Sequence, residues 1–385
     1  AESMSRALQL SLKDFGEARL TATDQKGPGG SIPSANVDLR YVQHALKRGF
    51  NDIAYTIGPE SLRRAEGSGL KLGKDFTRQF WITVAVPADA KAGAYTGEVT
   101  LDAGGTAIKL PISVEVLDLT LDEPDFVFTF YGFHVPGELA PERKANAAKE
   151  LMLLLKDYGM NTLSGGPGIP FKGFDAEGKP QLDFAACDAY FKTAKECGFT
   201  REMHAYGGPG VVTGLHDGYT IGATGKKWAQ QLGKPFPEVL KVVWGAVKEH
   251  AEKEGWPTVA VHMADEPRVV ESARENLELY KAYREGAPWV RLGGSYSVHW
   301  DESPLEKVIQ DIFKTLVHSA LNLHTQKDLD MAKEWGRDIY IYNQGINRYS
   351  FGAYQWAEMR KGVKGRLQWH LLALHGYQFF DLDGR

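Results

Sequence analysis

The stretch TVAVHMADEPRVVESARENLELYKAYREG (258–286) holds a strand-like run, two adjacent carboxylates and a helical run, in that order. The first run is short and apolar, whereas the last run repeats apolar residues at the longer spacing that is typical of a helix. From about residue 125 onward, strand-like and helix-like runs alternate in the same way. This alternation predicts parallel strands that are connected by helices.

Eight strand-like runs fall within about 260 residues, which is close to the size of a (β/α)8 barrel. They are FVFTFYGF (126–133), MNTLSG (160–165), REMHAYGG (201–208), TVAVHMADEP (258–267), VRLGGSYSVHW (290–300), TLVHSALNLHT (315–325), DIYIYNQG (338–345) and RLQWHLL (366–372). We therefore expect residues 125–385 to form a TIM barrel. Almost no helical pattern follows the eighth run.

Residues 1–120 show a different pattern, with short strands and turn signals. Apolar residues occupy every second position in FWITVAVP (80–87) and in AIKLPISVEVLDL (107–119). Glycine and aspartate flank a further strand at 95–101. The pattern predicts an antiparallel β-sandwich domain ahead of the barrel.

The composition is that of an ordinary globular protein, with 43% hydrophobic and 24% charged residues. Because 45 basic residues face 49 acidic ones without a long basic run, nucleic acid is not expected as a main partner. No apolar run reaches the roughly 18 residues that a membrane-spanning helix needs. Cys187 and Cys197 lie ten residues apart in one helical run, which is too far for a disulfide.

The tripeptide Asp-Glu-Pro occurs twice, at 122–124 and at 265–267. Barrel enzymes form their active sites at the C-terminal ends of the strands. The first copy precedes the first barrel strand, so we expect a solvated turn there. The second copy ends the fourth strand, so we expect Asp265 and Glu266 to be catalytic, with Pro267 favouring a break that lets both side chains face the cleft. The alternative is that Asp265 caps the next helix and Glu266 is solvated.

The second catalytic acid of common retaining glycosidases has no counterpart at its usual place. In many barrel glycosidases it ends the seventh strand, where this chain has Asn343 and Gln344. This absence favours a route in which the 2-acetamido oxygen of the substrate attacks the anomeric carbon. Glu266 would protonate the leaving oxygen and later deprotonate water, and Asp265 would orient the amide and stabilise the oxazolinium intermediate.

The segment TRQFWITVAVPADAKAGAYTGEVTLDAGGTAIKLPISVEVLDLTL (77–121), followed by a barrel whose fourth strand ends in Asp265-Glu266-Pro267, resembles glycoside hydrolase family 123. The resemblance covers most of the chain from about residue 35. It implies a β-N-acetylgalactosaminidase that removes terminal β-linked GalNAc with retention, with Asp265 holding the acetamido group and Glu266 as acid/base. Family members often carry a further β-sandwich after the barrel, whereas this sequence stops at Arg385. We therefore leave open whether a neighbouring subunit closes the site in a homo-oligomer.

Other residues at the ends of the expected barrel strands are candidates for binding the sugar. An aromatic side chain suits the face of the ring, and histidine or asparagine suits its hydroxyl groups. The candidates are Tyr131, His134, His204, Tyr206, Tyr296, Asn322, Tyr342, Asn343 and Trp369. Either Tyr296 or Tyr342 could also hold the acetamido oxygen. The sequence has no HExxH motif or Cys/His cluster, so no metal or other cofactor is expected.

Three alternatives stay open. One is an endo-acting or disaccharide-releasing β-N-acetylhexosaminidase with the same mechanism, and a second is a non-catalytic carbohydrate-binding barrel. The third is a glycosidase for sugars without an acetamido group, for which Asp381 or Asp383 would have to supply the missing acid. Glycan hydrolysis leads us to expect a secreted or periplasmic protein, although this sequence contains no signal peptide.

Overall fold

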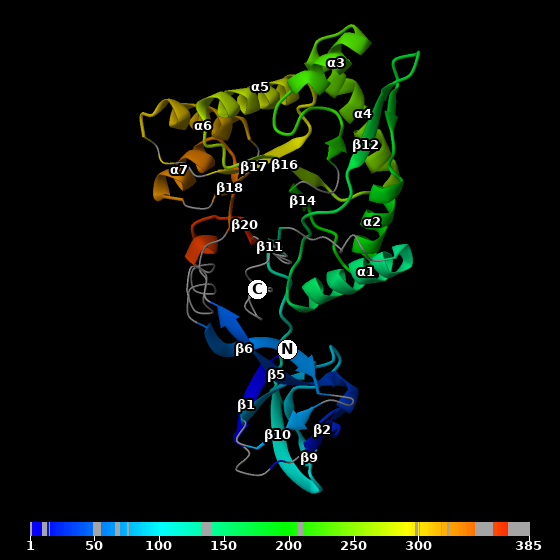
Figure 1. Cartoon of the computed structure of the whole chain (residues 1–385), viewed down its shortest axis with the longest axis vertical. Coiled ribbons are helices and arrows are strands. Elements are labelled where there is room, and N and C mark those ends of the chain that lie inside the picture. Colours follow the sequence, from blue (N-terminus) through cyan, green and yellow to red (C-terminus); the bar gives the residue numbers. More distant parts are fainter. Residues whose placement is uncertain are drawn as a thin grey trace. The chain divides into compact units, whose positions relative to one another are not determined.

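The computed structural model describes the chain except for residues 1, 10–13, 15, 49–54, 66–69, 75–76, 132–139, 207–210, 297–298, 300, 317, 322–323, 343–356 and 369–385. The fold is mixed α/β (Figure 1). Contacts divide the chain into two compact units, the first reaching Asp122 and the second beginning at Glu123.

The first unit contains two antiparallel sheets. One has the strand order β1-β8-β5-β6, and the other has the order β4-β3-β9-β2-β7 with β10 also paired to β9. The strands are β1 Glu2–Gln9, β2 Gly16–Ala22, β3 Gln25–Gly27, β4 Gly30–Ile32, β5 Val37–Arg48, β6 Tyr55–Arg64, β7 Lys71–Leu72, β8 Thr77–Val84, β9 Gly93–Ala103 and β10 Thr106–Val116. The three strands predicted at 80–87, 95–101 and 107–119 are confirmed as β8, β9 and β10.

Both sheets contribute to one buried cluster. Phe80 and Ile82 of β8 belong to it, as do Val99 and Leu101 of β9 in the other sheet. The alternating pattern of the sequence therefore turns one face of each sheet toward a shared core.

The second unit contains a seven-stranded parallel sheet in the order β11-β20-β19-β18-β17-β16-β14. Its strands are β11 Val127–Phe130, β14 Met203–Tyr206, β16 Val259–Asp265, β17 Arg291–Tyr296, β18 His318–Leu321, β19 Asp338–Ile341 and β20 Gly365–Gln368. Its helices are α1 Pro141–Asp157, α2 Ala185–Glu196, α3 Gly222–Leu232, α4 Phe236–Glu254, α5 Val270–Gly286, α6 Pro304–Thr315 and α7 Gln326–Glu334, which lie around the outside of the strands (Figure 1). Seven of the eight expected strands are present.

The expected strand at 160–165 forms no regular strand, but it touches both edges of this sheet. The backbone N–H of Asn161 donates to the carbonyl of Phe128 on β11 at 3.1 Å. On the other side, His204 of β14 donates to the carbonyl of Leu163 at 3.0 Å and forms a parallel bridge with Ser164. The segment thus bonds the two strands at opposite ends of the sheet order.

The second unit also contains a small sheet that the sequence pattern did not predict. Its strands are β12 Ile169–Phe174, β13 Pro180–Leu182 and β15 Val212–Thr213. The glycine-rich SGGPG at 164–168 leads directly into β12, which pairs in parallel with β15. A similar run, YGGPG at 206–210, lies outside the described residues apart from Tyr206.

Alternate residues of the parallel strands belong to two different clusters. Ile339 and Ile341 of β19 pack in a large outer cluster that also contains helix residues such as Leu277 of α5. Tyr340 and Tyr342 belong instead to a small inner cluster, which consists of Tyr131, Tyr340, Tyr342 and Leu367. Since strand side chains alternate between faces, the inner cluster marks the face that is turned away from the helices.

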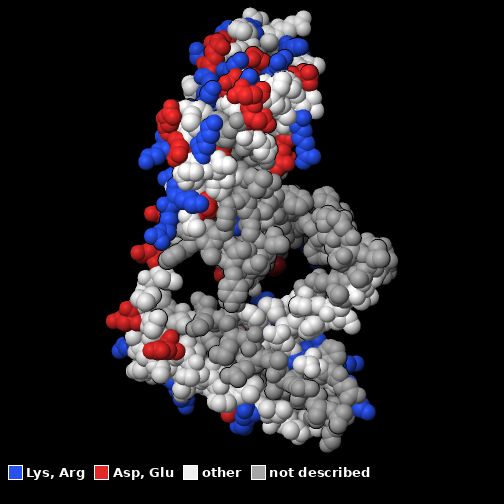
Figure 2. Space-filling model, turned by 90° about the vertical axis from the view of Figure 1, so that its left-hand side faces the viewer, with Lys and Arg blue, Asp and Glu red and all other residues white. Residues whose placement is uncertain are grey.

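Charged side chains of both signs are mixed on the face that Figure 2 shows. Ion pairs between neighbouring turns also occur on the helices, such as Lys241–Glu238 on α4 and Lys281–Glu278 on α5. Such exposed pairs contribute little to stability. Among the described residues, none of the helices is long and apolar enough to span a membrane.

Candidate active site

The end of β16 presents two adjacent carboxylates. Residues 260–264 of this strand are buried, whereas Asp265, its last residue, is exposed. The pairing with β17 shifts register between His262 and Asp265, and the N–H of Glu266 then donates to the carbonyl of Ser295 at 2.8 Å. The strand therefore breaks at the carboxylate pair, as the following proline predicts.

Glu266 has a backbone conformation that is unusual for its residue type. Its φ of 43° is positive, and no other non-glycine residue of the described chain shares this feature. Left-handed backbone costs a side-chain-bearing residue free energy and is found most often at functional sites. This conformation ends the regular alternation of the strand, so Glu266 need not point away from the face that Asp265 occupies.

Each carboxylate is held by its own tyrosine. Tyr206, the last residue of β14, donates its hydroxyl to Oδ2 of Asp265 at 2.5 Å. Tyr342, directly after β19, donates its hydroxyl to Oε1 of Glu266. A hydrogen bond of this kind holds the acceptor oxygen in one position. Two tyrosines from different strands thus fix the two carboxylates from opposite sides.

Both tyrosines remain protonated at neutral pH. Burial raises the pKa of Tyr206 far above its ordinary value, and the hydrogen bond to Asp265 raises it further. The pKa of Tyr342 is raised in the same way, first by burial and then by its bond to Glu266. Each phenol is therefore a donor, and each leaves one oxygen of its carboxylate open toward other groups.

One comparison with known proteins identifies the family of this chain. A sequence model described as the catalytic domain of glycoside hydrolase 123 matches residues 173–374. These residues include β16 and the carboxylate pair at its end.

The chain belongs to glycoside hydrolase family 123.

One solved structure has a similar fold. A family 123 glycoside hydrolase from Clostridium perfringens is 14% identical, with a TM-score of 0.65 over 96% of this chain and 72% of that chain. Xylanase 10B from Thermotoga petrophila RKU-1 (13% identical, 63% of this chain and 82% of that chain) and the endo-β-1,4-mannanase from Thermotoga petrophila (13%, 64% and 68%) both have TM-scores of 0.34 and are too distant to carry an argument. A search of curated proteins found no match.

The alternative role of Asp265, as the cap of the next helix, does not fit the structure of this family 123 chain. Helix α5, the next helix after Asp265, is capped by Val269 and has no side-chain cap. Asp265 instead accepts the hydroxyl of Tyr206. The other Asp-Glu-Pro, at 122–124, is a surface feature. Its Glu123 is exposed and forms ion pairs with Lys156 at 2.9 Å and with Arg201 at 3.7 Å.

Three of the predicted sugar-binding residues are too deeply buried to contact a sugar in this structure. Tyr131 is 2% exposed, and His204 and Tyr296 are fully buried. The Tyr296 hydroxyl lies 3.2 Å from both Asn276 and Tyr280 on α5, so its side chain faces the helices rather than the carboxylates. These placements argue against direct substrate contact by the three residues.

Four of the predicted sugar-binding residues cannot be placed. His134, Asn322, Asn343 and Trp369 lie outside the described residues. Of the nine candidates, the structure therefore brings Tyr206 and Tyr342 to the carboxylate pair, and it places Tyr131 beside them.

Two residues near the pair were not predicted. Arg268 places Nη2 3.4 Å from Oε2 of Glu266 while its side chain stays 85% exposed. Tyr219, in the loop before α3, lies close enough to Asp265 that this carboxylate adds to the burial that raises the tyrosine pKa. The position of Arg268 two residues after Glu266 could have indicated it, whereas no sequence pattern singles out Tyr219.

The histidines near the site are neutral and structural. Burial lowers the pKa of His262 to about 3 and holds that of His204 well below its ordinary value. Within the described ranges, no three side chains of His, Cys, Asp or Glu lie close enough together to hold a metal ion.

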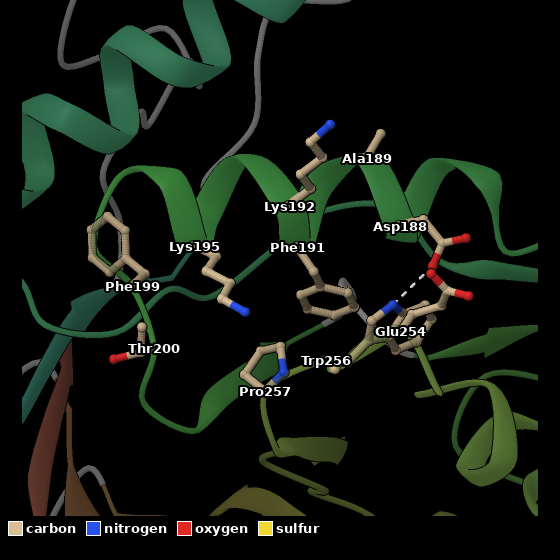
Figure 3. Close-up of a pocket in the computed structure, with 11 residues that line it drawn as sticks. Asp188, Ala189, Phe191, Lys192, Lys195, Phe199, Thr200, Glu254, Trp256 and Pro257 are labelled. Carbon is tan, nitrogen blue, oxygen red and sulfur yellow. Dashed lines mark hydrogen bonds between the residues drawn. The ribbon is translucent and has the colours of Figure 1, made fainter. Parts of the chain in front are cut away.

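A cavity of about 550 Å³ lies at the other end of β16 (Figure 3). It is lined by α2, the end of α4 and the Trp256-Pro257 pair that leads into the strand. Trp256 donates its indole N–H to Asp188 at 2.8 Å, and His250 contacts the same carboxylate at 2.9 Å. Because β16 runs from this cavity to Asp265, roughly 20 Å of strand separates the cavity from the carboxylates.

Proposed function

We propose that this family 123 chain hydrolyses the glycosidic bond of terminal β-linked N-acetylgalactosamine with retention, by substrate-assisted catalysis. The observation that carries the proposal is the adjacent pair Asp265 and Glu266 at a strand end, with each carboxylate bound by its own tyrosine. No enzyme nucleophile is required, because the 2-acetamido oxygen of the sugar attacks the anomeric carbon.

Glu266 is the acid/base in this mechanism. In the first step its carboxyl proton passes to the leaving glycosidic oxygen, the bond from C1 to that oxygen breaks, and the acetamido oxygen bonds to C1. In the second step the Glu266 carboxylate takes a proton from water, and the water oxygen displaces the acetamido oxygen at C1. Each step inverts C1, so the product retains the β configuration.

Asp265 stabilises the positive charge that the acetamido group acquires. Its Oδ2 atom is bound by Tyr206, which leaves Oδ1 to accept the N–H of the acetamido group. A fixed carboxylate beside a developing cation stabilises the intermediate without rearranging at the moment of reaction. Tyr206 therefore contributes by keeping this carboxylate in one orientation.

We propose a closed barrel for the second unit, which contains this site, and a β-sandwich for the first unit. The hydrogen bonds of residues 161–163 to both β11 and β14 support closure of the parallel sheet through this segment. The core that is shared by the two antiparallel sheets supports a sandwich in the first unit. Closure would place the ends of β14, β16 and β19 on one rim, which fits the convergence of Tyr206, Asp265 and Tyr342.

Glycolipid glycans are the source of substrate that we propose. The Clostridium perfringens relative is described in connection with glycolipid glycan hydrolysis. Glycans of this kind are found at cell surfaces, so we propose that the enzyme acts as a secreted or periplasmic protein. The proposed partner is a glycan that ends in β-GalNAc.

The test is release of p-nitrophenol from the matched β-GalNAc, β-GlcNAc and β-Gal glycosides. We expect the wild type to cleave the β-GalNAc glycoside and Glu266→Gln to lose about a hundredfold or more in kcat, because the second step loses its general base. Proton NMR of the first sugar released should show the β anomer. A GalNAc-derived thiazoline, which mimics the intermediate, should inhibit the wild type and bind Asp265→Asn more weakly.

Other outcomes separate the alternatives. Turnover of β-Gal at a comparable rate would contradict the acetamido mechanism, and an α product would contradict retention. If all three glycosides stay intact, cleavage of a longer glycan with release of a disaccharide would favour the endo-type alternative. Binding of that glycan without hydrolysis would favour a non-catalytic barrel.

A further inference from the structure

Tyr131 lies next to the two tyrosines that bind the carboxylate pair. It follows β11 directly and belongs to the inner cluster, where its side chain is 2% exposed. A sugar cannot reach a side chain that is covered to this extent. Its role must therefore come from the residues that it contacts.

Tyr131 packs against both of the tyrosines that bind the carboxylates. Its ring centroid lies 4.6 Å from that of Tyr206, with the planes inclined at 35°. The ring of Tyr342 approaches edge-on at 6.5 Å and 65°. These separations lie in the range at which aromatic pairs attract each other beyond the effect of burial.

The two contacts connect the halves of the site. Tyr206 binds Asp265, and Tyr342 binds Glu266. Tyr131 contacts both of these tyrosines, and the ring of His262 lies 5.6 Å from the ring of Tyr131. A shift of Tyr131 would therefore move both tyrosines and, through them, both carboxylates.

We propose that Tyr131 is a positioning residue that holds Tyr206 and Tyr342, and through them Asp265 and Glu266, in a fixed relation to each other. We assign this role to the ring, because ring contacts connect it to both tyrosines, whereas the hydroxyl lies near Ser295. In substrate-assisted catalysis the acid must reach the leaving oxygen while Asp265 reaches the acetamido group, so their relative position determines the rate. The kinetic part of this inference rests on the proposed function.

Substitution by phenylalanine and by leucine separates the ring from the hydroxyl. Tyr131→Phe keeps both ring contacts, so we expect its kcat to stay within about threefold of wild type. Tyr131→Leu leaves Tyr206 and Tyr342 without their partner, and we expect kcat to fall about 30-fold or more with KM changed less than threefold, because misplacement by 1 Å can cost about a hundredfold. The pH at which kcat falls to half should also move in this variant, because the surroundings of Glu266 change.

A matched control measures general destabilisation. Phe313 on α6 is also fully buried and packs on Trp335, with ring centroids 5.6 Å apart, but it does not belong to the inner cluster. Phe313→Leu should lower the melting temperature to a similar extent and leave kcat and its pH profile unchanged. Equal loss of kcat in Tyr131→Phe and Tyr131→Leu, or no loss in either, would overturn the proposal.

A second readout needs no substrate, so it separates failure of this inference from failure of the proposed function. Tyrosine carrying ¹³C at Cζ gives NMR signals that move when the phenol ionises, and Tyr206→Phe and Tyr342→Phe assign the two signals. In the wild type we expect both phenols to stay neutral beyond pH 10, where an unperturbed tyrosine ionises. In Tyr131→Leu at least one should ionise at lower pH, because water reaches the ring; unchanged titration would contradict the proposal whether or not β-GalNAc is hydrolysed.

Discussion

Tyr342 donates its hydroxyl to Oε1 of Glu266 although 76 residues separate the two in the chain. The bond connects the end of β19 to the break after β16, and these strands are separated by β17 and β18 in the sheet order. A buried phenol with a strongly raised pKa stays protonated and so remains a donor to the carboxylate. A residue that follows a distant strand therefore helps to hold the Glu266 carboxylate in position.

Removal of this hydroxyl should lower kcat. Glu266 becomes a charged acceptor as it releases its proton, and a hydrogen bond to a charged group contributes about 1.5–3 kcal/mol, so Tyr342→Phe should reduce kcat by roughly 10- to 150-fold with little change in KM. The matched control is Tyr296→Phe, since Tyr296 is equally buried but bonds to Asn276 and Tyr280. That variant should lose about 1 kcal/mol of unfolding free energy and keep kcat within twofold. Comparable kcat losses in both variants would mean that the Tyr342 bond has no special role.

Substitution of Glu266 by glycine should remove the strain of its left-handed backbone conformation. Because its φ is 43°, Glu266→Gly should be more stable to urea than Glu266→Ala, by about 1 kcal/mol. Both variants should be inactive. At the exposed position Glu275 within α5, the same comparison should have the opposite sign, since glycine in a helix costs about 1 kcal/mol relative to alanine. Greater stability of the alanine variant at Glu266 would show that the left-handed conformation is not maintained.

The positions of the carboxylates were predictable, whereas the roles of most other residues were not. Asp265 follows a clear strand pattern, so its place at a strand end could be read from the sequence. The orientation of Tyr296 could not, because Gly293 and Gly294 remove the apolar alternation that would show which face each residue of β17 occupies.

The features that the sequence did not predict depend on contacts between distant loops and strands. The position of Tyr219 depends on the path of a loop, and that of Tyr131 on the inner cluster, and neither leaves a periodic pattern. The segment at 160–165 has too few apolar residues in alternation to distinguish a short bridge from a full strand.

The two Asp-Glu-Pro sequences provide a matched pair of variants. Glu123 is exposed and pairs with Lys156 and Arg201, and surface ion pairs contribute about 0–1 kcal/mol. Glu123→Gln should therefore keep full activity and lose at most about 1 kcal/mol of unfolding free energy, whereas Glu266→Gln should lose activity and remain folded. Hydrolysis rates and urea denaturation curves of the two variants check this. A large loss of kcat in Glu123→Gln would mean that the first copy also serves the reaction.

Acid should destabilise the protein through its buried histidines. Burial lowers the pKa of His262 to about 3 and that of His216 to about 4, whereas an unfolded histidine titrates near 6.5. Between these values the unfolded chain binds more protons than the folded one, so stability is complete above about pH 6.5 and falls as the pH decreases.

One such histidine should cost about 2 kcal/mol of unfolding free energy between pH 7 and pH 5. The rings of Tyr131, Tyr206 and His204 lie near His262, and burial is the cause that lowers its pKa. In His262→Gln the decrease between pH 7 and pH 5, measured by urea denaturation, should be smaller by about this amount, even if the variant is less stable at pH 7. An identical pH dependence in the variant would mean that His262 is protonated in the folded protein or does not contribute to its acid sensitivity.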